Sequence, residues 1–465
     1  MPNTTSYAGR AVSTTGETFN KLTVSFWFKG MADPATSTQR SIWGLNDNSD
    51  SNRFFNLYFS SNGSLYGYWK QNEGLFFTLG TMQKFRDPNA WTHFLMVMDT
   101  TLGTAADRVK YYLNGERITV FEDSLDTITQ NASSNILINT DGRMWWGGAK
   151  TSGTFHYYDG SLSHCHMCVG YAYQADSFGE TDATTGQWKI KTSPSVSYGT
   201  NGGFWFKDGN QFTDSSSNGN TLSTTSGSVT KTEDNPSNVF ATLNALVNTS
   251  GDTNSLSNGN NTYTNQNYSY NTRSTLGMTS GKFYWEMKVN NASAVKVGVC
   301  TSQYDPSLDT DSSTAHYGGA GGGGVYVLMS NSTTTWQSTF SDTSKATGSY
   351  TNAIASTSSS ILMGAVDVDA NKLWVGVDGV WMNSGNPATG ANAQLTFTNS
   401  SPDALHIMAS HGDDSTQRST KFNFGNGYFG TTAVSSAGIN ASGNGIFEYD
   451  VPTGFTALST KGLNL

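Results

Sequence analysis

The sequence has few charged residues, and its Lys and Arg residues form no cluster. Charged residues make up 13% of the chain, against about 25% in typical globular domains. Acidic residues outnumber basic ones by 35 to 26. Because binding to a phosphate backbone requires many cations close together, we expect no nucleic-acid partner. The polar surface must consist largely of Ser, Thr, Asn and Gly, which makes it neutral and rich in hydroxyl groups.

Cysteine and long apolar runs are also scarce. Three cysteines in 465 residues cannot build a disulfide framework, so packing must stabilise the fold. The most apolar stretches, such as 91–98, have the length of a strand and contain polar residues, so we expect no membrane insertion. Residues 1–5 lack the basic and apolar regions of a secretory signal, which predicts synthesis in the cytoplasm.

Apolar side chains occur at the spacing of β-strands. No segment keeps a 3.6-residue apolar period over the length of a helix. Residues 22–28 alternate instead, and this pattern predicts a half-buried antiparallel strand with Leu22, Val24, Phe26 and Phe28 on its buried face. Further strands are expected at 54–59, 65–69, 93–98 and 136–138, with turn residues between them. The predicted fold class is all-β.

Two segments have the composition of tight hairpins. Residues 109–118 contain Asn114-Gly115, and residues 373–381 contain Asp378-Gly379. Both dipeptides favour a type I′ turn, in which the two central residues have positive φ.

The length of the chain predicts more than one domain. From about residue 207 to 270 the composition shifts to Ser, Thr, Asn, Asp and Gly, with only sparse apolar residues. We therefore predict two antiparallel β-sandwich domains of the jelly-roll type, at 1–190 and 246–465. A Ser/Thr/Asn-rich connector at 191–245 would join them.

The order of the apolar segments in the first domain resembles that of laminin-G-like, concanavalin-A-like domains. The segments that carry this resemblance are LTVSFWF (22–28), SIWG (41–44), WTHF (91–94), YLNG (112–115) and YDGSL (158–162). The resemblance implies a jelly-roll sandwich at 1–190.

The second domain resembles SPRY domains. A Trp-bearing entry strand, a Leu-Trp strand that runs into an Asp-Gly hairpin, and a closing Asn-Phe-Gly strand occur in the family's order: GKFYWEM (281–287), VGV (297–299), DVDANKLW (367–374) and NFG (423–425). This resemblance implies a second sandwich.

The pairing of the two domains is similar to that in marine bacteriophage virion structural proteins. The segments SFGETD (177–182), GQW (186–188), NVFATLN (238–244) and PTGFTAL (452–458) carry this similarity. It implies a location in the virion, other virion proteins as partners, and a homo-oligomer, for which a trimer is the first expectation.

Exposed aromatic residues are the best candidates for ligand binding, because sugar rings stack on flat apolar faces. Trp145 and Trp146 are adjacent, so one of them must point away from the core if the segment is extended. The same logic applies to Tyr157 and Tyr158. Trp336 is a further candidate in the second domain. The alternative for all five is that they cap the sandwich cores.

No catalytic site and no cofactor are expected. Residues 164–168 (HCHMC) have the residue types of a zinc site, but a strand would point Cys165 and Cys168 to opposite sides. We therefore expect packed cysteines, surface histidines and no metal. The oxygen-rich segment 46–50 is compatible with calcium, although an Asx-rich turn is favoured.

Three functions remain to be weighed. The leading hypothesis is a phage tail fibre or adhesin that binds glycans or proteins of the host surface. The second is a capsid-decorating or tail-structural protein that contacts only virion subunits. The third, a polysaccharide-degrading enzyme, is disfavoured because no acid pair is spaced for glycoside hydrolysis, and Asp367 and Asp369 have the pattern of structural residues.

Overall fold

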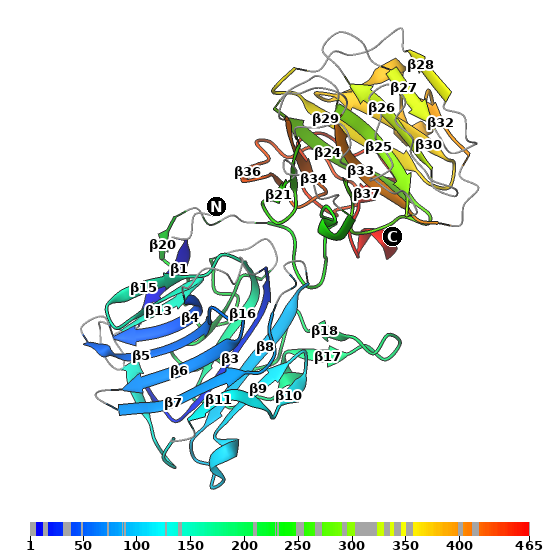
Figure 1. Cartoon of the computed structure of the whole chain (residues 1–465). Helices are drawn as coiled ribbons and strands as arrows, with labels where there is room; N and C mark the ends of the chain where they lie inside the picture. Colours follow the sequence, from blue (N-terminus) through cyan, green and yellow to red (C-terminus); the bar gives the residue numbers. More distant parts are fainter. Residues whose placement is uncertain are drawn as a thin grey trace. The chain divides into compact units, whose positions relative to one another are not determined.

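The computed structural model consists of antiparallel strands and a few short 3-10 helices (Figure 1). The all-β prediction is confirmed. Within the part of the chain that is described, no helix is long and apolar enough to cross a membrane. The structure describes residues 6–12, 17–30, 39–47, 50–71, 74–85, 87, 90–125, 128–137, 142–207, 212–227, 229, 232–247, 255–265, 272–290, 295–302, 323–329, 335–338, 346–349, 357–398, 403–411 and 418–464.

The chain divides into two compact units, which are described separately. The first comprises Met1–Lys231 with Asn235–Ser237, and the second comprises Thr232–Asp234 with Asn238–Leu465. These boundaries differ from the predicted ones, because most of the predicted connector 191–245 belongs to the first unit.

Two strands explain why this segment is not a connector. Strand β19 (Gly203–Trp205) pairs with a central strand of one sheet, and β20 (Thr224–Ser226) pairs with a strand of the other. Trp205 is fully buried in the core. The polar, glycine-rich composition of the segment concealed these edge strands, since each is only three residues long.

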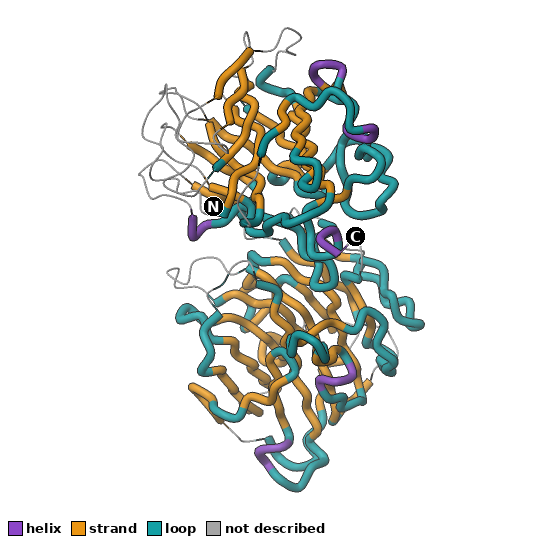
Figure 2. The backbone as a smooth tube through the Cα atoms, turned by 90° about the vertical axis from the view of Figure 1, so that its right-hand side faces the viewer, coloured by secondary structure: helices purple, strands orange, loops and turns teal. Residues whose placement is uncertain are grey.

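The first unit is a sandwich of two antiparallel sheets, which appear as strand layers in Figure 2. The larger sheet has the order β11-β7-β6-β5-β4-β13-β1-β20, and the smaller has the order β10-β9-β8-β3-β16-β19. The larger sheet contains β1 (Tyr7–Ala11), β4 (Arg40–Asp47), β5 (Asp50–Phe59), β6 (Leu65–Gln71), β7 (Gly74–Thr81), β11 (Phe121–Leu125), β13 (Gly142–Trp146) and β20. The smaller contains β3 (Lys21–Lys29), β8 (Thr92–Asp99), β9 (Val109–Leu113), β10 (Glu116–Ile118), β16 (Ser161–Val169) and β19.

Three two-stranded sheets and two short helices complete the first unit. The pairs are β2 (Glu17–Phe19) with β12 (Ser134–Leu137), β14 (Gly148–Thr151) with β15 (Thr154–Tyr157), and β17 (Gly179–Thr181) with β18 (Trp188–Ile190). The helices are η1 (Ala105–Asp107) and η2 (Ala175–Ser177).

Strand β3 illustrates how the sequence pattern forms the core. Leu22, Val24, Phe26 and Phe28 all lie between the sheets, as predicted. The opposite face of β3 is buried as well, because the segment 171–200 lies over it. There Thr23 Oγ1 donates to the carbonyl oxygen of Tyr171 and accepts from the backbone N–H of Tyr173, both at 2.9 Å. The strand is therefore fully buried rather than half-buried.

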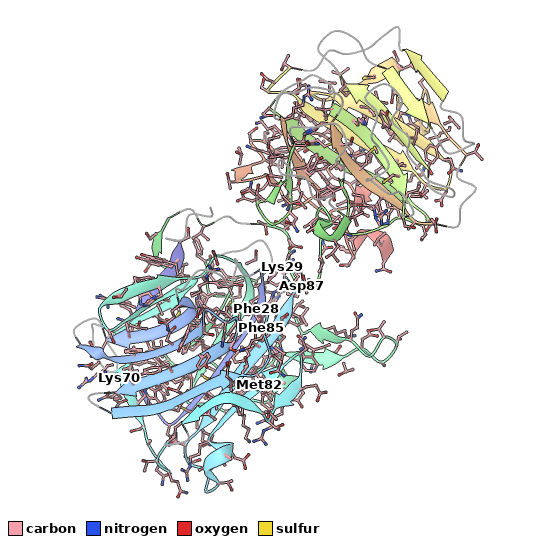
Figure 3. The ribbon with its side chains drawn as sticks, in the orientation of Figure 1. Phe28, Lys29, Lys70, Met82, Phe85 and Asp87 are labelled. Atoms are coloured by element: carbon pink, nitrogen blue, oxygen red, sulfur yellow. The ribbon has the colours of Figure 1, made fainter. Side chains whose placement is uncertain are left out.

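Aromatic rings close one end of this core. Phe28 packs against Phe59 and Phe85, with ring centroids 5.3 Å apart in both contacts (Figure 3). Three rings at one end of the sandwich exclude water from the space between the sheets.

Both predicted hairpins form. Asn114 and Gly115 have φ of 46° and 84° between β9 and β10, and Asp378 and Gly379 have φ of 49° and 84° in the second unit. These are the two consecutive left-handed residues that a type I′ turn requires.

The second unit is also built from two main sheets. The larger follows the order β21-β22-β34-β24-β29-β30-β31, with β32 added to β30 and β37 parallel to β24; the smaller follows the order β23-β33-β25-β26-β27-β28. The larger sheet contains β21 (Ser255–Ser257), β22 (Thr262–Asn265), β24 (Lys282–Val289), β29 (Ile361–Asp367), β30 (Lys372–Val377), β31 (Val380–Trp381), β32 (Leu395–Thr396), β34 (Arg418–Asn423) and β37 (Thr456–Ala457). The smaller contains β23 (Thr272–Arg273), β25 (Val295–Thr301), β26 (Gly324–Met329), β27 (Thr335–Ser338), β28 (Ala346–Ser349) and β33 (Leu405–His411).

Small elements complete the second unit. They are the pair β35 (Tyr428–Phe429) and β36 (Thr432–Ala433), and the helices η3 (Ala245–Val247), η5 (Met382–Ser384), η6 (Pro387–Thr389) and η7 (Gly462–Asn464). The C-terminal segment covers the outer face of the larger sheet, where Phe447, Val451 and Phe455 pack on Tyr284 and Trp374.

Candidate functional site

The structure places Trp145 and Trp146 on opposite faces of β13, as the sequence predicts. Trp146 points into the core and is 1% exposed. Trp145 points out of the sheet but is only 8% exposed, because the rings of Tyr7 and Phe155 cover it. Its indole Nε1 donates to Oδ1 of Asn46 at 2.6 Å. Trp145 therefore points away from the core as predicted, but neither ring is open for stacking on a sugar.

The other predicted aromatic residues differ in exposure. Tyr158 is buried in the core, and its hydroxyl donates to the carbonyl oxygen of Gly30 at 2.5 Å. Tyr158 is therefore the member of this pair that caps the core, which is the alternative given above, and it is not open to a ligand. Tyr157 is partly exposed and packs against Phe155 with ring centroids 4.8 Å apart. The backbone of Trp336 lies in β27, but its side chain is outside the described residues.

The predicted cysteine arrangement within 164–168 is confirmed. Cys165 lies in the core between the two main sheets, whereas Cys168 lies in the cluster under the segment 171–200. Burial raises the pKa of both thiols, which keeps them protonated. The described residues contain no group of three or more His, Cys, Asp and Glu side chains placed to hold a metal ion.

The histidines of this strand are buried, which corrects the prediction of surface histidines. His164 is 1% exposed and His166 is 2% exposed. The ring of His166 stacks on Phe204 at 4.0 Å, and its Nδ1 lies 3.0 Å from the hydroxyl of Tyr198. Burial holds the pKa of His166 well below its usual value, so the ring is neutral.

The other acidic and oxygen-rich segments have structural contacts. Asp367 accepts from the backbone N–H of Ala370 and pairs with Lys282 at 3.1 Å. Asp369 accepts from the backbone N–H of Gly281 at 3.1 Å. In the segment 46–50, two central residues lie outside the described residues, so its predicted turn is not assigned.

The outer face of the eight-stranded sheet holds a different set of aromatic residues. On β5 and β6 the core residues alternate with residues that face away from the core. Three tyrosines in this outward set are partly exposed. We call the set the aromatic face; its members are Phe54, Asn56 and Tyr58 on β5, and Tyr66, Tyr68 and Lys70 on β6.

The rings of the aromatic face form two stacked pairs. Phe54 and Tyr68 have centroids 5.5 Å apart and planes inclined by 11°. Tyr58 and Tyr66 have centroids 5.5 Å apart and planes inclined by 19°. Because Asn56 lies between Phe54 and Tyr58 along β5, the two pairs flank its amide.

Asn56 lacks the hydrogen bonds that a buried amide normally has. The residue is 0% exposed, and neither Nδ2 nor Oδ1 hydrogen-bonds to any other described residue. A buried polar group without a partner costs about 1–3 kcal/mol. The natural partner of such an amide is a water molecule or a ligand.

The hairpin β14–β15 forms a wall beside Asn56. Gly44 is the cross-strand neighbour of Asn56 on β4, and a Cβ on Gly44 would lie 2.5 Å from the Cβ of Ala149. A glycine is therefore required for β14 to pack down on β4. The hairpin covers β4 but leaves Tyr58, Tyr66 and Tyr68 partly exposed.

Lys70 is the cation of the aromatic face. It lies near the end of β6, opposite the start of β7. Met82 follows the other end of β7, so the two residues lie at opposite ends of this strand pair (Figure 3). Its Nζ donates to Oδ1 of Asn52 at 2.8 Å. The described outward residues of β5 and β6 include no carboxylate, so the aromatic face is apolar and weakly cationic.

None of these face residues was predicted as a binding residue. The available signal was the alternation in 54–59 and 65–69, which places Tyr66 and Tyr68 opposite the core residues Leu65 and Trp69. The predicted binding residues were mainly adjacent aromatic pairs. Adjacency in the sequence does not reveal which of two neighbours is covered by another segment.

Comparison with known proteins bears on the first unit. Residues 4–165 match the family model described as "Concanavalin A-like lectin/glucanases superfamily". The first unit has a concanavalin-A-like jelly-roll fold. We refer to it as the jelly-roll unit. No curated protein matches the chain.

Solved structures show more distant likenesses. The heptameric SAP-like pentraxin from Limulus polyphemus is 16% identical over 37% of this chain and 73% of that chain, with a TM-score of 0.26. The Ruminococcus gnavus IT-sialidase CBM40 is 19% identical over 36% and 93%, with a TM-score of 0.26. The SPRY domain of human HERC1 is 14% identical over 39% and 96%, with a TM-score of 0.27. These TM-scores are too low to decide fold or function, and the SPRY-like assignment of the second unit stays a prediction.

A buried histidine links the segment 171–200, which covers β3, to the rest of the jelly-roll unit. His93 is 0% exposed and stacks between Trp27 and Trp188. Its Nδ1 accepts from the indole Nε1 of Trp188 at 3.0 Å, and its Nε2 donates to the hydroxyl of Ser25 at 2.8 Å. Burial lowers the pKa of His93 to about 3, so the ring is neutral.

Acid should therefore destabilise the jelly-roll unit. The stabilising contribution of His93 is complete above its ordinary pKa of 6.5 and is lost as pH falls toward 3. In this range the unfolded chain binds a proton at His93, whereas the folded chain does not. At pH 5 the loss is about 2 kcal/mol from this residue. Urea unfolding followed by Trp fluorescence at pH 7 and pH 5 measures it. Equal pH dependence in wild type and His93→Gln would contradict this assignment.

The second unit holds a carboxylate that is fully buried. Glu286 is 0% exposed and accepts from the backbone N–H groups of Glu448 and Tyr449 at 2.9 and 2.8 Å. It also accepts from the hydroxyl of Tyr284 at 2.9 Å. Burial outweighs these donors and raises the pKa of Glu286 to about 7. Its contacts fasten the C-terminal segment to the sheet, which is a structural role.

Proposed function

We propose that this chain is a glycan-binding adhesin that uses the aromatic face of its jelly-roll unit. The observation that carries the proposal is the amide of Asn56, which is buried without a hydrogen-bond partner between two stacked aromatic pairs. Aromatic rings accept the apolar faces of sugars, and an amide supplies both a donor and an acceptor for their hydroxyl groups.

Access to Asn56 requires a small rearrangement of the face. Tyr68 is the cross-strand neighbour of Asn56 on β6 and is partly exposed. Exposed side chains change rotamer within picoseconds to nanoseconds, and such changes are common on binding. A sugar that displaces Tyr68 brings its hydroxyl groups to Nδ2 and Oδ1 of Asn56, which relieves their unsatisfied state.

The chemistry of the face favours binding over hydrolysis. Glycoside hydrolysis requires two carboxyl groups about 5–9 Å apart across the scissile bond. The described outward residues of β5 and β6 supply amide, hydroxyl and ammonium groups instead. These groups hold a ligand without providing an acid or a nucleophilic carboxylate.

The test measures stability and glycan binding separately in two variants of the aromatic face. Asn56→Leu removes the unsatisfied amide, so the free energy of unfolding should stay equal or rise by about 1 kcal/mol. The same change should weaken glycan binding about tenfold or more. Tyr68→Ala should weaken it about tenfold through lost stacking. A glycan array identifies the sugar, and calorimetry with that sugar measures affinity.

The control is Tyr171→Ala, since Tyr171 is 40% exposed, lies in the segment 171–200 and is not part of the aromatic face. Its affinity should equal that of wild type. Loss of stability in Asn56→Leu with unchanged affinity would show that the amide is structural, and the proposal would then fail.

We further propose that the adhesin belongs to a bacteriophage virion, as a homotrimeric tail fibre or fibre-tip protein that contacts other virion proteins. The support is the ordered set of segments that resemble phage structural proteins, together with the neutral, hydroxyl-rich composition. A cryo-EM map of the particle would locate the chain. Density only on the capsid lattice would favour a capsid-decorating protein instead.

A further inference from the structure

A cavity opens along one side of the jelly-roll unit, where the edges of its two sheets face each other. Its volume is about 260 Å³. Strands β7 and β11 line it from the larger sheet, and β9 and β10 line it from the smaller. It is separate from the aromatic face of the proposed glycan site, because its apolar lining belongs to the space between the sheets.

The inner lining of the cavity is apolar. Phe77, Ile118 and Ile128 are 3%, 6% and 4% exposed, so they belong to the buried core. The partly buried residues Leu79, Val109 and Phe121 complete this lining. An apolar molecule, or the apolar part of one, is therefore favoured inside.

Two cations lie at the rim of this apolar cavity. Lys110 and Arg117 both line it, whereas Asp107, their shared counter-ion on η1, does not. Arg117 Nη2 lies 2.9 Å from Asp107 Oδ1, but Lys110 Nζ lies 3.9 Å from the same oxygen. Two positive charges share one negative charge, so the rim carries a formal charge of +1.

The polar groups of the rim have unused hydrogen-bonding capacity. Lys110 Nζ donates no hydrogen bond to a described residue, and its contact with Asp107 Oδ1 is 3.9 Å long. Arg117 uses Nη2 for Asp107 and for the carbonyl oxygen of Ala106, which leaves its other N–H groups for a further acceptor. The exposed Thr119 adds a hydroxyl at the same rim.

We propose that this cavity binds a small amphipathic carboxylate, with its apolar chain inside and its carboxylate between Lys110 and Arg117. The volume is just below the ~300 Å³ at which typical ligand pockets begin, so the ligand is small, with about ten non-hydrogen atoms. A carboxylate supplies the negative charge that the rim lacks and accepts charge-assisted hydrogen bonds from both side chains.

The test titrates the full chain with octanoate by calorimetry and follows thermal unfolding. We expect a Kd of about 0.1–1 mM, weaker at high salt, and a rise in the unfolding temperature with octanoate concentration. Lys110→Gln and Arg117→Gln should each weaken binding about fivefold or more. The matched control Lys189→Gln, which removes an exposed lysine on β18, should leave the affinity unchanged.

Two further measurements separate this site from nonspecific apolar binding. Neutral 1-octanol should bind at least about fivefold more weakly than octanoate, because it cannot use the rim charge. Thr119→Trp places a large side chain at the exposed rim and should abolish octanoate binding while the chain stays folded. Equal affinities for octanoate and octanol, or unchanged octanoate binding in Thr119→Trp, would overturn the proposal. Absence of any octanoate binding in wild type would overturn it as well.

Discussion

Replacing Trp146 with Ala should lower the free energy of unfolding of the jelly-roll unit by about 3–5 kcal/mol. The indole is 1% exposed and contacts Phe26, Trp43 and Trp205 at centroid distances of 5.9, 6.2 and 6.2 Å. These partners come from both sheets, so the ring joins the two halves of the sandwich. Its removal leaves a large cavity that the neighbouring rings cannot fill.

Hydrogen exchange of peptides from β13 in the full chain measures the stability of the jelly-roll unit separately from that of the second unit. Trp146→Phe, which leaves most of the volume filled, should lose less stability than Trp146→Ala. Trp145→Ala is the matched control, because that ring lies on the outer face of the sheet against Tyr7 and Phe155, and its loss should cost about half as much or less. A Trp146→Ala protein as stable as wild type would disprove the placement of this ring in the core.

Replacing Glu286 with Ala should lower the stability of the second unit by about 3 kcal/mol. The change leaves the backbone N–H groups of Glu448 and Tyr449 buried without an acceptor, at about 1–3 kcal/mol for each unsatisfied group. The C-terminal segment should then detach, since these bonds fasten it to the sheet. Faster hydrogen exchange at 444–458, with β25 unchanged, would report local release, and wild-type exchange at 444–458 would contradict the assignment.

The raised pKa of Glu286 predicts that its contribution to the stability of the second unit falls as pH rises. The folded pKa of Glu286 is about 7 and its ordinary value is 4.5, so its protonated form is favoured by folding. Its stabilising contribution is complete below pH 4.5 and is lost as pH rises through 7, by about 3 kcal/mol in all. Buried His411, whose pKa is lowered to about 3, acts in the opposite direction. The measurement is therefore the pH dependence of the free energy of unfolding in wild type and in Glu286→Gln. Wild type should lose more stability than the variant as pH rises through 7. Equal pH dependence in the two proteins would contradict the titration of Glu286.

Local patterns predicted the central strands and the tight turns correctly. Alternation in 22–28 gave the buried face of β3, and the dipeptides at 114–115 and 378–379 gave two type I′ turns. Both kinds of signal depend on neighbours in the sequence, since side-chain direction in a strand and φ in a turn are local properties.

Segments that cover the sheets could not be predicted in this way. Residues 171–200 and 434–458 have no strand or helix period, yet they bury the outer faces of two sheets. Their apolar anchors are isolated residues such as Phe178, Phe447 and Phe455. For this reason the sequence suggested exposed histidines on β16, and the structure buries them.

The candidate site was hidden for a related reason. Outward tyrosines on β5 and β6 are visible in the alternation, but whether a sheet face is open depends on which hairpin folds over it. The hairpin β14–β15 covers Trp145 and leaves Tyr68 partly exposed. The unsatisfied amide of Asn56 is a property of three-dimensional packing alone.

The most direct test of the glycan site is the side-chain NH₂ signal of Asn56 in ¹H–¹⁵N NMR spectra of the asparagine-labelled chain, assigned by its loss in Asn56→Leu. Addition of the glycan identified on the array should shift this signal with saturation at the calorimetric Kd. The control signal is Asn218, whose Nδ2 donates to the carbonyl oxygen of Gly202 at 3.0 Å, and it should not move. A bound glycan that leaves the Asn56 signal unchanged would contradict the account.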